Sequence, residues 1–116
     1  MTRLDYQAYS KVAIKTMANI LRDARAQVSR SEHHTPGAVS SILKCSVYHR
    51  LGTVPVGEPS IVIAVSSPHR RESFVACEYI LEEVKRRAQI WKREFYEGEP
   101  EETAEWKENV TTSKSP

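Results

Sequence analysis

Apolar residues recur along the chain in two helical rhythms, with strand-like stretches between them. In residues 6–28 they return every three or four positions, which predicts a first helix. A second run starts at Phe74 and has the same spacing, which predicts a second helix that reaches about Lys92. Its apolar positions are 74, 77, 81, 84, 88 and 91. Each helix is therefore expected to pack one face against a larger element.

Between the two helices the pattern becomes that of strands. Residues 38–48 broadly alternate between apolar and polar, as a strand does when one face is buried. Residues 60–66 are apolar without alternation, so we expect a central strand covered on both faces. Prolines and glycines in 29–37 and 50–59 predict loops. The order helix, strand, strand, helix predicts an α+β fold, in which two main helices cover one antiparallel or mixed sheet.

Length and composition fit a single domain. The 116 residues are 40% hydrophobic and 28% charged, enough for one modest core. We expect the domain to span residues 1–110 and residues 111–116 to form a disordered tail. The charged start of the chain and the lack of any ~20-residue apolar run predict a soluble, cytosolic protein with no membrane partner. The net charge of +2 gives little support to a nucleic-acid partner.

The cysteines and histidines give no sign of a disulfide framework or a metal centre. Cys45 and Cys77 are expected to be small buried apolar side chains, and a nucleophilic thiol is the alternative. His33 and His34 adjoin a Thr-Pro-Gly loop and match no zinc spacing. We therefore expect neither a metal nor a cofactor.

Basic side chains gather where the second helix should begin and where it should end. Pro68 is expected to open this helix with Ser67 as its cap, which places His69 and Arg70 at a strand-to-helix junction. Free backbone amides at such a junction attract anions.

At the other end, Lys85 and Lys92 lie seven residues apart, almost two helical turns, so both are expected to point the same way. We expect these ammonium groups and the Arg70 guanidinium to converge on one anion-sized hollow. From the residues alone, a solvated basic helix face and a small nucleic-acid-binding module both remain alternatives.

Several motifs, in order, give the chain a family resemblance. They are Leu4-Asp5-Tyr6-Gln7-Ala8-Tyr9, Tyr48-His49-Arg50-Leu51-Gly52, Val65-Ser66-Ser67-Pro68-His69-Arg70, and Lys85 with Ile90-Trp91-Lys92-Arg93-Glu94. Over about the first 95 residues the chain resembles the large, catalytic subunit of molybdopterin synthase. That family normally has an N-terminal section with strands and a glycine-rich loop before the first motif. The resemblance therefore implies an α/β-hammerhead-like fold without this section.

The resemblance also implies an activity and partners. The family transfers sulfur from the C-terminal thiocarboxylate of a small ubiquitin-like subunit to cyclic pyranopterin monophosphate, forming the dithiolene of molybdopterin in molybdenum cofactor biosynthesis. Two large subunits form a homodimer at the core of a heterotetramer. The alternative is a shortened, non-catalytic form that still binds the small subunit.

Site residues carry over by position from the same resemblance. Lys85 matches the family's catalytic lysine, and Lys92 matches its second active-site lysine. The matches to residues that bind the substrate are His69, Arg70, Lys85, Lys92, Arg93 and Glu94. A phosphate-bearing pterin needs fixed positive charge, and a cation beside the small subunit's acyl group would stabilise a developing oxyanion.

Overall fold

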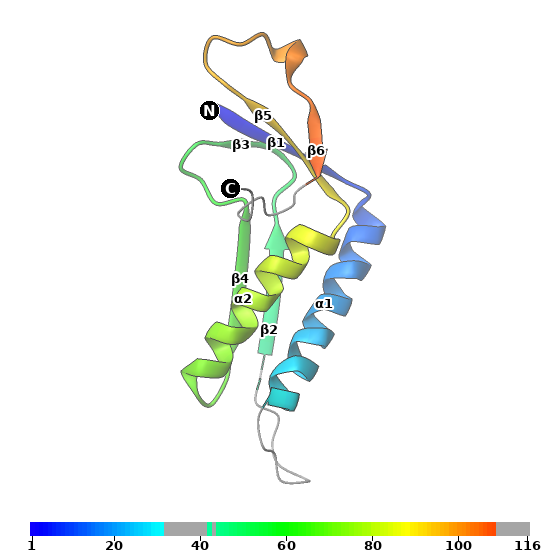
Figure 1. Ribbon diagram of the computed structural model, residues 1–116, viewed down its shortest axis with the longest axis vertical. Coiled ribbons are helices and arrows are strands. Elements are labelled where there is room, and N and C mark those ends of the chain that lie inside the picture. The colour runs from blue at the N-terminus through cyan, green and yellow to red at the C-terminus, as the bar shows by residue number, and fades with distance from the viewer. Residues whose placement is uncertain (32–41, 43, 109–116) are drawn as a thin grey trace.

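The computed structural model describes residues 1–31, 42 and 44–108 of the chain. The elements, in chain order, are β1 (Arg3–Ala8), α1 (Ser10–Ser31), β2 (Lys44–His49), β3 (Gly52–Pro55), β4 (Ile61–Ser66), α2 (Arg70–Arg87), β5 (Ile90–Phe95), the 3-10 turn η1 (Glu101–Thr103) and β6 (Trp106–Glu108). Figure 1 shows an elongated molecule in which both helices lie with β2 and β4 toward its lower end. The predicted α+β class is confirmed. Within the described residues, no helix is long and apolar enough to cross a membrane.

The strands form two sheets rather than the single sheet that the pattern predicted. One has four strands in the order β3-β1-β5-β6, and the other pairs β2 with β4; every pairing is antiparallel. Figure 1 places the four-stranded sheet at one end of the molecule, whereas β2 and β4 run beside the helices at the other. The four-stranded sheet was overlooked because β1, β3 and β5 overlap segments predicted as helix or loop.

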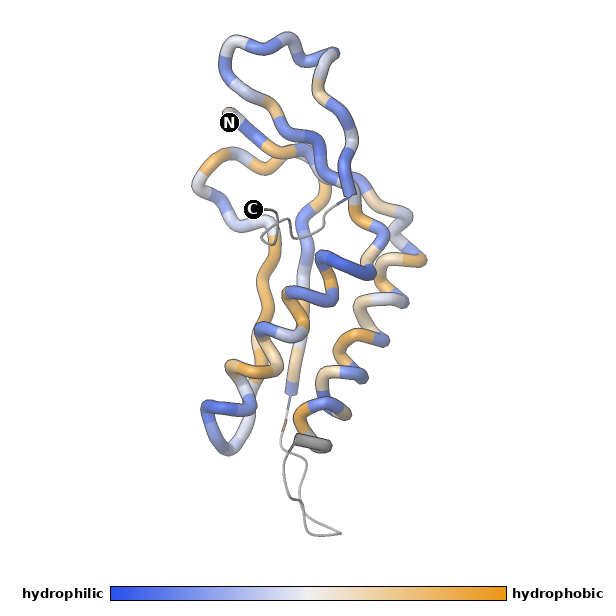
Figure 2. Tube along the Cα trace, viewed as in Figure 1, coloured by the Kyte–Doolittle hydropathy of each residue, from blue (hydrophilic) through white to orange (hydrophobic). Residues whose placement is uncertain are grey.

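The two helices pack on one face of the β2–β4 sheet. Ile20 and Ala24 of α1 meet Ile80 and Val84 of α2, and all four are fully buried. The strand residues packed against them are Cys45, Val47, Ile61, Ile63 and Val65. Figure 2 shows this apolar run along β4. Burial of these side chains supplies the main driving force for folding this half of the molecule.

The opposite face of the same sheet is open. Tyr48 and Val62, which pair across the two strands, are 71% and 55% exposed. Side chains of β4 therefore alternate between packed and exposed positions. The expected central strand, covered on both faces, is wrong: the helices cover only one side, and β2 is the one partner of β4 among the described strands.

The first helix begins later than predicted, because residues 6–8 belong to β1. Tyr6 is buried with Ala13, Val54 and Ile90 in a second, smaller core. Its neighbour Gln7 is exposed. The start of the predicted helix therefore shows the alternation between buried and exposed residues that is typical of a strand. The end of the helix was also misplaced, since α1 continues to Ser31.

The rest of the predicted loop 29–37 lies outside the described residues, with His33 and His34 in it. Residues 38–41 and 43 of the predicted strand and the predicted tail 111–116 also lie outside them.

The second helix is shorter than predicted at both ends. It begins at Arg70, with His69 rather than Ser67 as its N-cap residue in extended conformation. It ends at Arg87, because Ala88 turns to extended backbone at φ −72° and ψ 139°. Residues 90–95 then pair with β1 as β5, so the helix does not continue to Lys92. Ile90, Trp91 and Phe95 are residue types that favour a strand once a partner strand is available.

The buried face of α2 also differs from the predicted one. Ala76, Ile80 and Val84 are fully buried, whereas Phe74, the first residue of the predicted apolar seam, is 71% exposed. Of the seam predicted at 74, 77, 81, 84, 88 and 91, Val84 is fully buried as expected, but the seam as a whole is wrong. The spacing of these positions is helical, but positions 88 and 91 lie beyond the end of α2. The residues of α2 that are buried recur every four positions.

Candidate functional site

The residues expected to share one hollow lie at the two ends of α2. His69 and Arg70 lie at its start, and Lys85 lies in its last turn. At ~1.5 Å per residue, Arg70 and Lys85 are separated by about 22 Å along the helix axis. The expected convergence of Arg70, Lys85 and Lys92 is therefore wrong for a single chain.

Lys92 lies on β5 rather than on α2, so Lys85 and Lys92 do not share a helix face. Across the strands Lys92 pairs with Tyr6 and with Lys107. Side chains alternate along a strand, so Lys92 and Glu94 project from one face of the sheet, and Trp91 and Arg93 project from the other. The turn to extended backbone at Ala88 thus separates the two lysines that the helical spacing had aligned.

Glu94 is held between two lysines. Its Oε1 accepts hydrogen bonds from Lys107 Nζ at 3.2 Å and from the Tyr96 hydroxyl at 3.1 Å, and its Oε2 lies 3.5 Å from Lys92 Nζ. Burial alone would raise the pKa of Glu94. The hydrogen bonds and the charges of Lys107 and Lys92 outweigh it and hold this pKa below its ordinary value. Lys92 therefore has a charged carboxylate beside it.

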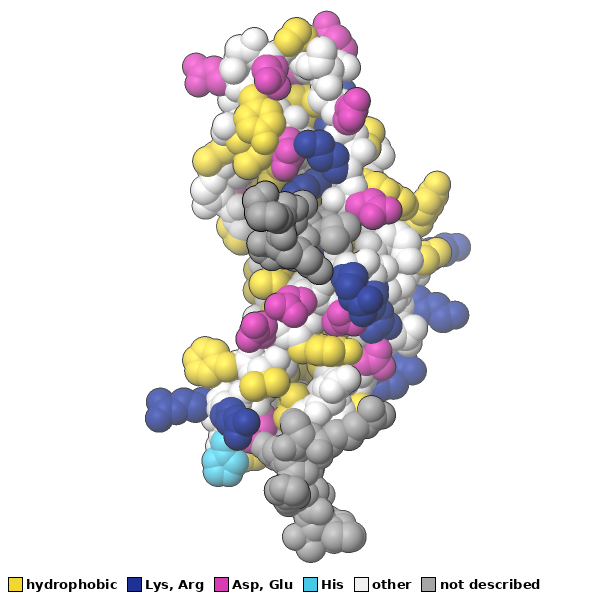
Figure 3. Space-filling view, viewed as in Figure 1, with side chains coloured by type: hydrophobic (Ala, Val, Ile, Leu, Met, Phe, Trp, Pro, Cys, Tyr) yellow, Lys and Arg dark blue, Asp and Glu magenta, His cyan; other side chains and the backbone are white. Residues whose placement is uncertain are grey.

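A small hollow lies where α2 ends and β5 begins. Its volume is about 220 Å³, and its lining residues are Lys85, Arg86, Arg87, Ala88, Gln89, Ile90, Trp91 and Glu108. In Figure 3, Lys and Arg side chains cluster at mid-height, in the region where α2 ends. Lys92 is not part of this lining.

The two arginines in the hollow are already paired. Glu83 lies 2.6 Å from Arg86 and 3.3 Å from Arg87, and Asp23 lies 2.8 Å from Arg87. Hydrogen bonds from Arg86 and Arg87 hold the pKa of Glu83 below its ordinary value, against an opposing effect of burial. Lys85 is half-buried and has no hydrogen bond or ion pair with the described residues. Among the cations of this hollow, the Lys85 ammonium group is therefore the one whose N–H donors are available to a ligand.

The start of α2 presents exposed cations. Ser67 Oγ donates a hydrogen bond to the His69 carbonyl at 2.5 Å, while the His69 and Arg70 side chains are exposed and unpaired among the described residues. Glu72 in the same turn is buried, and its Oε2 has no partner in the described part of the chain. A carboxylate in the first turn interacts favourably with the positive end of the helix.

The guanidinium group of Arg93 donates hydrogen bonds to backbone carbonyls of the same chain. Its Nε donates to the Ala104 carbonyl and its Nη2 to the Glu101 carbonyl, both at 2.9 Å. Its guanidinium also lies 5.1 Å from the Phe95 ring centroid and 5.8 Å from that of Trp106. In this arrangement Arg93 ties β5 to the segment that returns as β6.

A larger hollow, lined mainly by aromatic rings, was not anticipated from the sequence. It measures about 540 Å³ and is lined by Gln7, Ala8, Tyr9, Trp91 and Trp106. The Tyr9 and Trp91 rings meet edge to face, with centroids 5.6 Å apart. Sequence reasoning had assigned Trp91 to helix packing; the alternation of Trp91, Arg93 and Phe95 is the signal that would have placed it on a sheet face.

The cysteines lie away from both hollows. Cys45 and Cys77 are free and half-buried rather than fully buried. Burial, with a smaller contribution from Cys45, raises the pKa of the Cys77 thiol, which disfavours a thiolate nucleophile. Cys45 lines a separate hollow of about 390 Å³ beside Arg25 and Lys44. Among the described residues, no group of three His, Cys, Asp or Glu side chains is placed to hold a metal ion.

Comparison with protein families and curated proteins gives consistent matches. The family model described as MoaE protein matches residues 1–87. A molybdopterin synthase catalytic subunit of Coccidioides immitis (strain RS) is 45% identical over 112 residues, which cover 97% of this chain and 51% of the relative. Molybdopterin synthase catalytic subunit 2 of Aedes aegypti is 43% identical over 110 residues, 95% of this chain and 63% of the relative. The chain thus spans between about half and two-thirds of the length of these relatives.

Solved structures agree in fold. The X-ray crystal structure of molybdopterin synthase from Staphylococcus aureus matches with a TM-score of 0.72 at 30% identity, covering 91% of this chain and 66% of that one. The molybdopterin biosynthesis MoaE protein from Burkholderia ambifaria matches with a TM-score of 0.69 at 21% identity, covering 96% of this chain and 65% of that one. At 21% identity the second match shows a similar fold and nothing more.

Proposed function

Because the chain belongs to the MoaE family of molybdopterin synthase catalytic subunits, we propose that it performs the sulfur transfer that builds the dithiolene of molybdopterin. The sulfur donor is the C-terminal thiocarboxylate of a small ubiquitin-like subunit, and the acceptor is cyclic pyranopterin monophosphate. The observation that carries this proposal is the position of Lys85. It is a half-buried ammonium group, unpaired among the described residues, and it lines a hollow whose other cations are held by acids.

Lys85 is the proposed catalytic residue. In the reaction, the thiocarboxylate sulfur forms a bond to a carbon of the pterin substrate, which gives a thioester with the small subunit. Water then attacks the acyl carbon, and negative charge develops on the acyl oxygen. Collapse of this intermediate breaks the carbon–sulfur bond, leaves the sulfur on the pterin and releases the small subunit as a carboxylate. An ammonium group placed beside this oxygen stabilises the charge, and it does so more strongly where water is partly excluded. Arg86 and Arg87 are paired with Glu83 and Asp23, so they do not compete with Lys85 for this contact.

Lys92 and Glu94 are proposed to act together from the neighbouring strand. The carboxylate of Glu94 lies between Lys92 and Lys107, so it fixes the position of the Lys92 ammonium group. It has no ion pair with Lys85, the cation of the hollow that is unpaired among the described residues. Arg93 supports the same segment through its two bonds to backbone carbonyls.

His69 and Arg70 require a second copy of the chain if they bind the same substrate molecule. The length of α2 keeps them about 22 Å from Lys85 in their own chain. A homodimer at the core of a heterotetramer would allow the start of one α2 to approach the end of the other. Their free, exposed side chains suit contact with a phosphate.

The test is the Lys85→Ala variant, assayed for dithiolene formation with thiocarboxylated small subunit. Loss of an oxyanion-stabilising donor typically costs about 10²–10³ in turnover, so at least a hundredfold decrease is expected. Lys15→Ala, on the exposed side of α1, is the matched control and should keep full activity. Near-normal turnover of Lys85→Ala would contradict the proposal.

A binding experiment separates the enzyme from a non-catalytic binding subunit. Wild-type chain that captures the small subunit in a pull-down, yet forms no dithiolene with it, would be a binding subunit only. A nucleic-acid-binding module is disfavoured because Arg86 and Arg87 are paired with carboxylates.

A further inference from the structure

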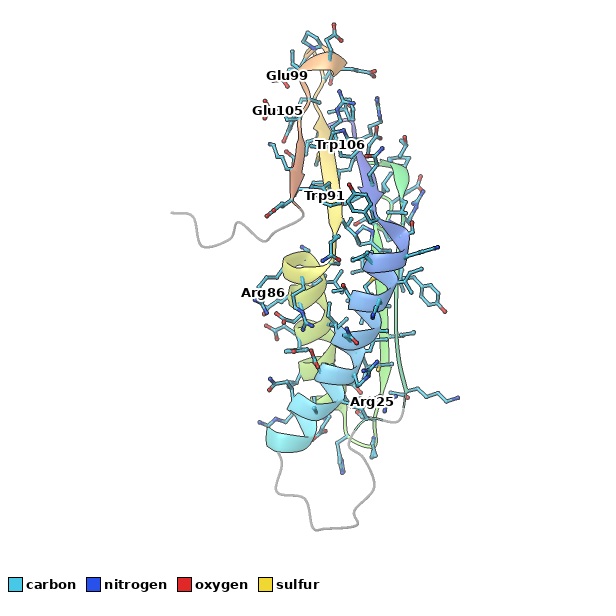
Figure 4. All side chains as sticks on the ribbon, turned by 90° about the vertical axis from the view of Figure 1, so that its right-hand side faces the viewer. Arg25, Arg86, Trp91, Glu99, Glu105 and Trp106 are labelled. Carbon is cyan, nitrogen blue, oxygen red and sulfur yellow. The ribbon has the colours of Figure 1, made fainter. Side chains whose placement is uncertain are left out.

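The turn that joins α2 to β5 brings a side-chain amide to the hollow at Lys85. Gln89 lies in this turn, and both Gln89 and Lys85 line the hollow of about 220 Å³. In Figure 4, Arg86 near the end of α2 lies below Trp91 of β5, and the turn connects the two elements. The hollow is smaller than the ~300–1,000 Å³ typical of sites for whole small molecules. It therefore suits a small group, such as the acyl end of a peptide tail.

The Gln89 amide has a defined orientation. The hydroxyl of Thr16 on α1 donates a hydrogen bond to Gln89 Oε1 at 3.1 Å. With its oxygen engaged in this way, the amide has two N–H donors left on Nε2. These donors have no hydrogen-bond partner among the described residues. Glu72 Oε2 is the one buried side-chain atom without a partner in that part of the chain, so Gln89 Nε2 is accessible to a ligand or to water.

Both hydrophobic cores hold this amide in place. Thr16 lies on α1 between Ala13, which is buried in the smaller core, and Ile20, which is buried in the larger one. Ala88, the neighbour of Gln89, packs against both cores. The hydroxyl and the turn that it contacts therefore have little freedom to move. A donor fixed before the reaction stabilises a developing charge without reorganisation, as in an oxyanion hole.

We propose that Gln89 is a second hydrogen-bond donor to the acyl oxygen of the small subunit, beside Lys85, and that Thr16 is the positioning residue that orients it. This assignment rests on the proposed function and adds a catalytic residue to it. Neutral amide and ammonium donors complement each other at one oxygen, because an oxyanion accepts more than one hydrogen bond.

The step at which Gln89 acts is the hydrolysis of the thioester. The oxygen of water forms a bond to the acyl carbon, and the electron pair of the C=O π bond moves to the acyl oxygen. One N–H of Gln89 and one of Lys85 stabilise this oxyanion. Its collapse restores the C=O bond and breaks the carbon–sulfur bond, whose electron pair leaves with the pterin sulfur. The proton lost by the water has an acceptor in the exposed carboxylate of Glu108, which lines the same hollow.

The test compares two variants in the assay for dithiolene formation. Gln89→Met keeps the length of the side chain and removes its donors, and kcat is expected to fall at least tenfold with KM nearly unchanged, because the charge develops only in the transition state. Thr16→Val removes the same Thr16–Gln89 hydrogen bond but leaves the amide donors, so it should cost much less. Equal losses in the two variants would assign Gln89 a purely structural role and overturn the inference. Thr53→Val, which removes a hydrogen bond to Asp5 away from the hollow, is the matched control and should keep full activity.

An NMR measurement tests the contact without turnover. The side-chain N–H signals of Gln89 are assigned by their absence from the spectrum of Gln89→Met. Adding the small subunit in its carboxylate form should shift these signals, and adding a small subunit shortened by its last residue should not. Signals that stay in place while the intact small subunit binds would overturn the inference even if dithiolene forms, and so would the absence of any binding. A shift in a chain that forms no dithiolene would support the contact and defeat the proposed function alone.

Discussion

The two halves of the molecule are held together by different forces. Where α1 and α2 cover β2 and β4, four aliphatic side chains are fully buried in one cluster, with a second cluster around Val28 and Ala76. The four-stranded sheet has a thinner core, and cation–π contacts and side-chain hydrogen bonds supplement it. Both candidate hollows lie on the four-stranded sheet or where it meets α2. Stability is therefore concentrated in the helical half, and binding chemistry in the other.

The largest effect is expected in the helical core. Ile80→Ala removes a side chain with no exposed surface between both helices and β4. Such truncations cost about 2–5 kcal/mol of unfolding free energy, because transfer and cavity terms add. Urea denaturation would measure the loss. Val75→Ala, nearly half exposed on the same helix, is the control and should cost under about 1 kcal/mol. Equal losses in the two variants would refute the concentration of stability in this cluster.

A smaller and more local effect is expected at Arg93. Arg93→Met keeps the aliphatic stem but removes the donors to Ala104 and Glu101. Charged hydrogen bonds of this kind contribute about 1–3 kcal/mol. Amide hydrogen exchange should accelerate in β5 and β6, while α2 stays protected. Uniform acceleration through both halves would show that the four-stranded sheet does not open independently.

The smallest expected effect is a pH dependence at Glu83. Its pKa in the folded chain lies below the ordinary 4.5, so the unfolded chain binds its proton more readily. The resulting stabilisation is present above about pH 4.5 and is lost as the pH falls through the folded pKa. Glu83→Gln should flatten the stability profile in that window, by under about 1 kcal/mol for a largely surface network. Glu82→Gln is the control, because Glu82 is one residue away and has no hydrogen-bond or ion-pair partner among the described residues; it should leave the profile as in wild type.

The sequence predicted the helical half better than the sheet. The rhythm of Ile20, Ala24 and Val28 is local, and α1 follows it. The strands β1 and β5 depend on each other across most of the chain, since Tyr6 pairs with Lys92. A local pattern of apolar residues cannot show that two segments so far apart in the sequence pair with each other. The apolar spacing up to Trp91 was therefore attributed to a helix.

The candidate site divides in the same way. Lys85 was identified from its motif and does line a hollow. The expected meeting of Lys85 with Lys92 and Arg70 failed because it assumed one continuous helix and ignored the length of α2. The aromatic hollow was missed because its rings come from Tyr9, the residue before α1, and from two strands that the pattern did not reveal.

The placement of both indole rings has a practical consequence. The chain has two tryptophans, Trp91 and Trp106, and both line the aromatic hollow. Intrinsic emission excited at the red edge of the absorption band therefore originates from one small region, without any label. Quenching, spectral shift and anisotropy of this emission would each detect ligand binding or a conformational change at the aromatic hollow. The helical half has no indole among its described residues and does not contribute to the signal.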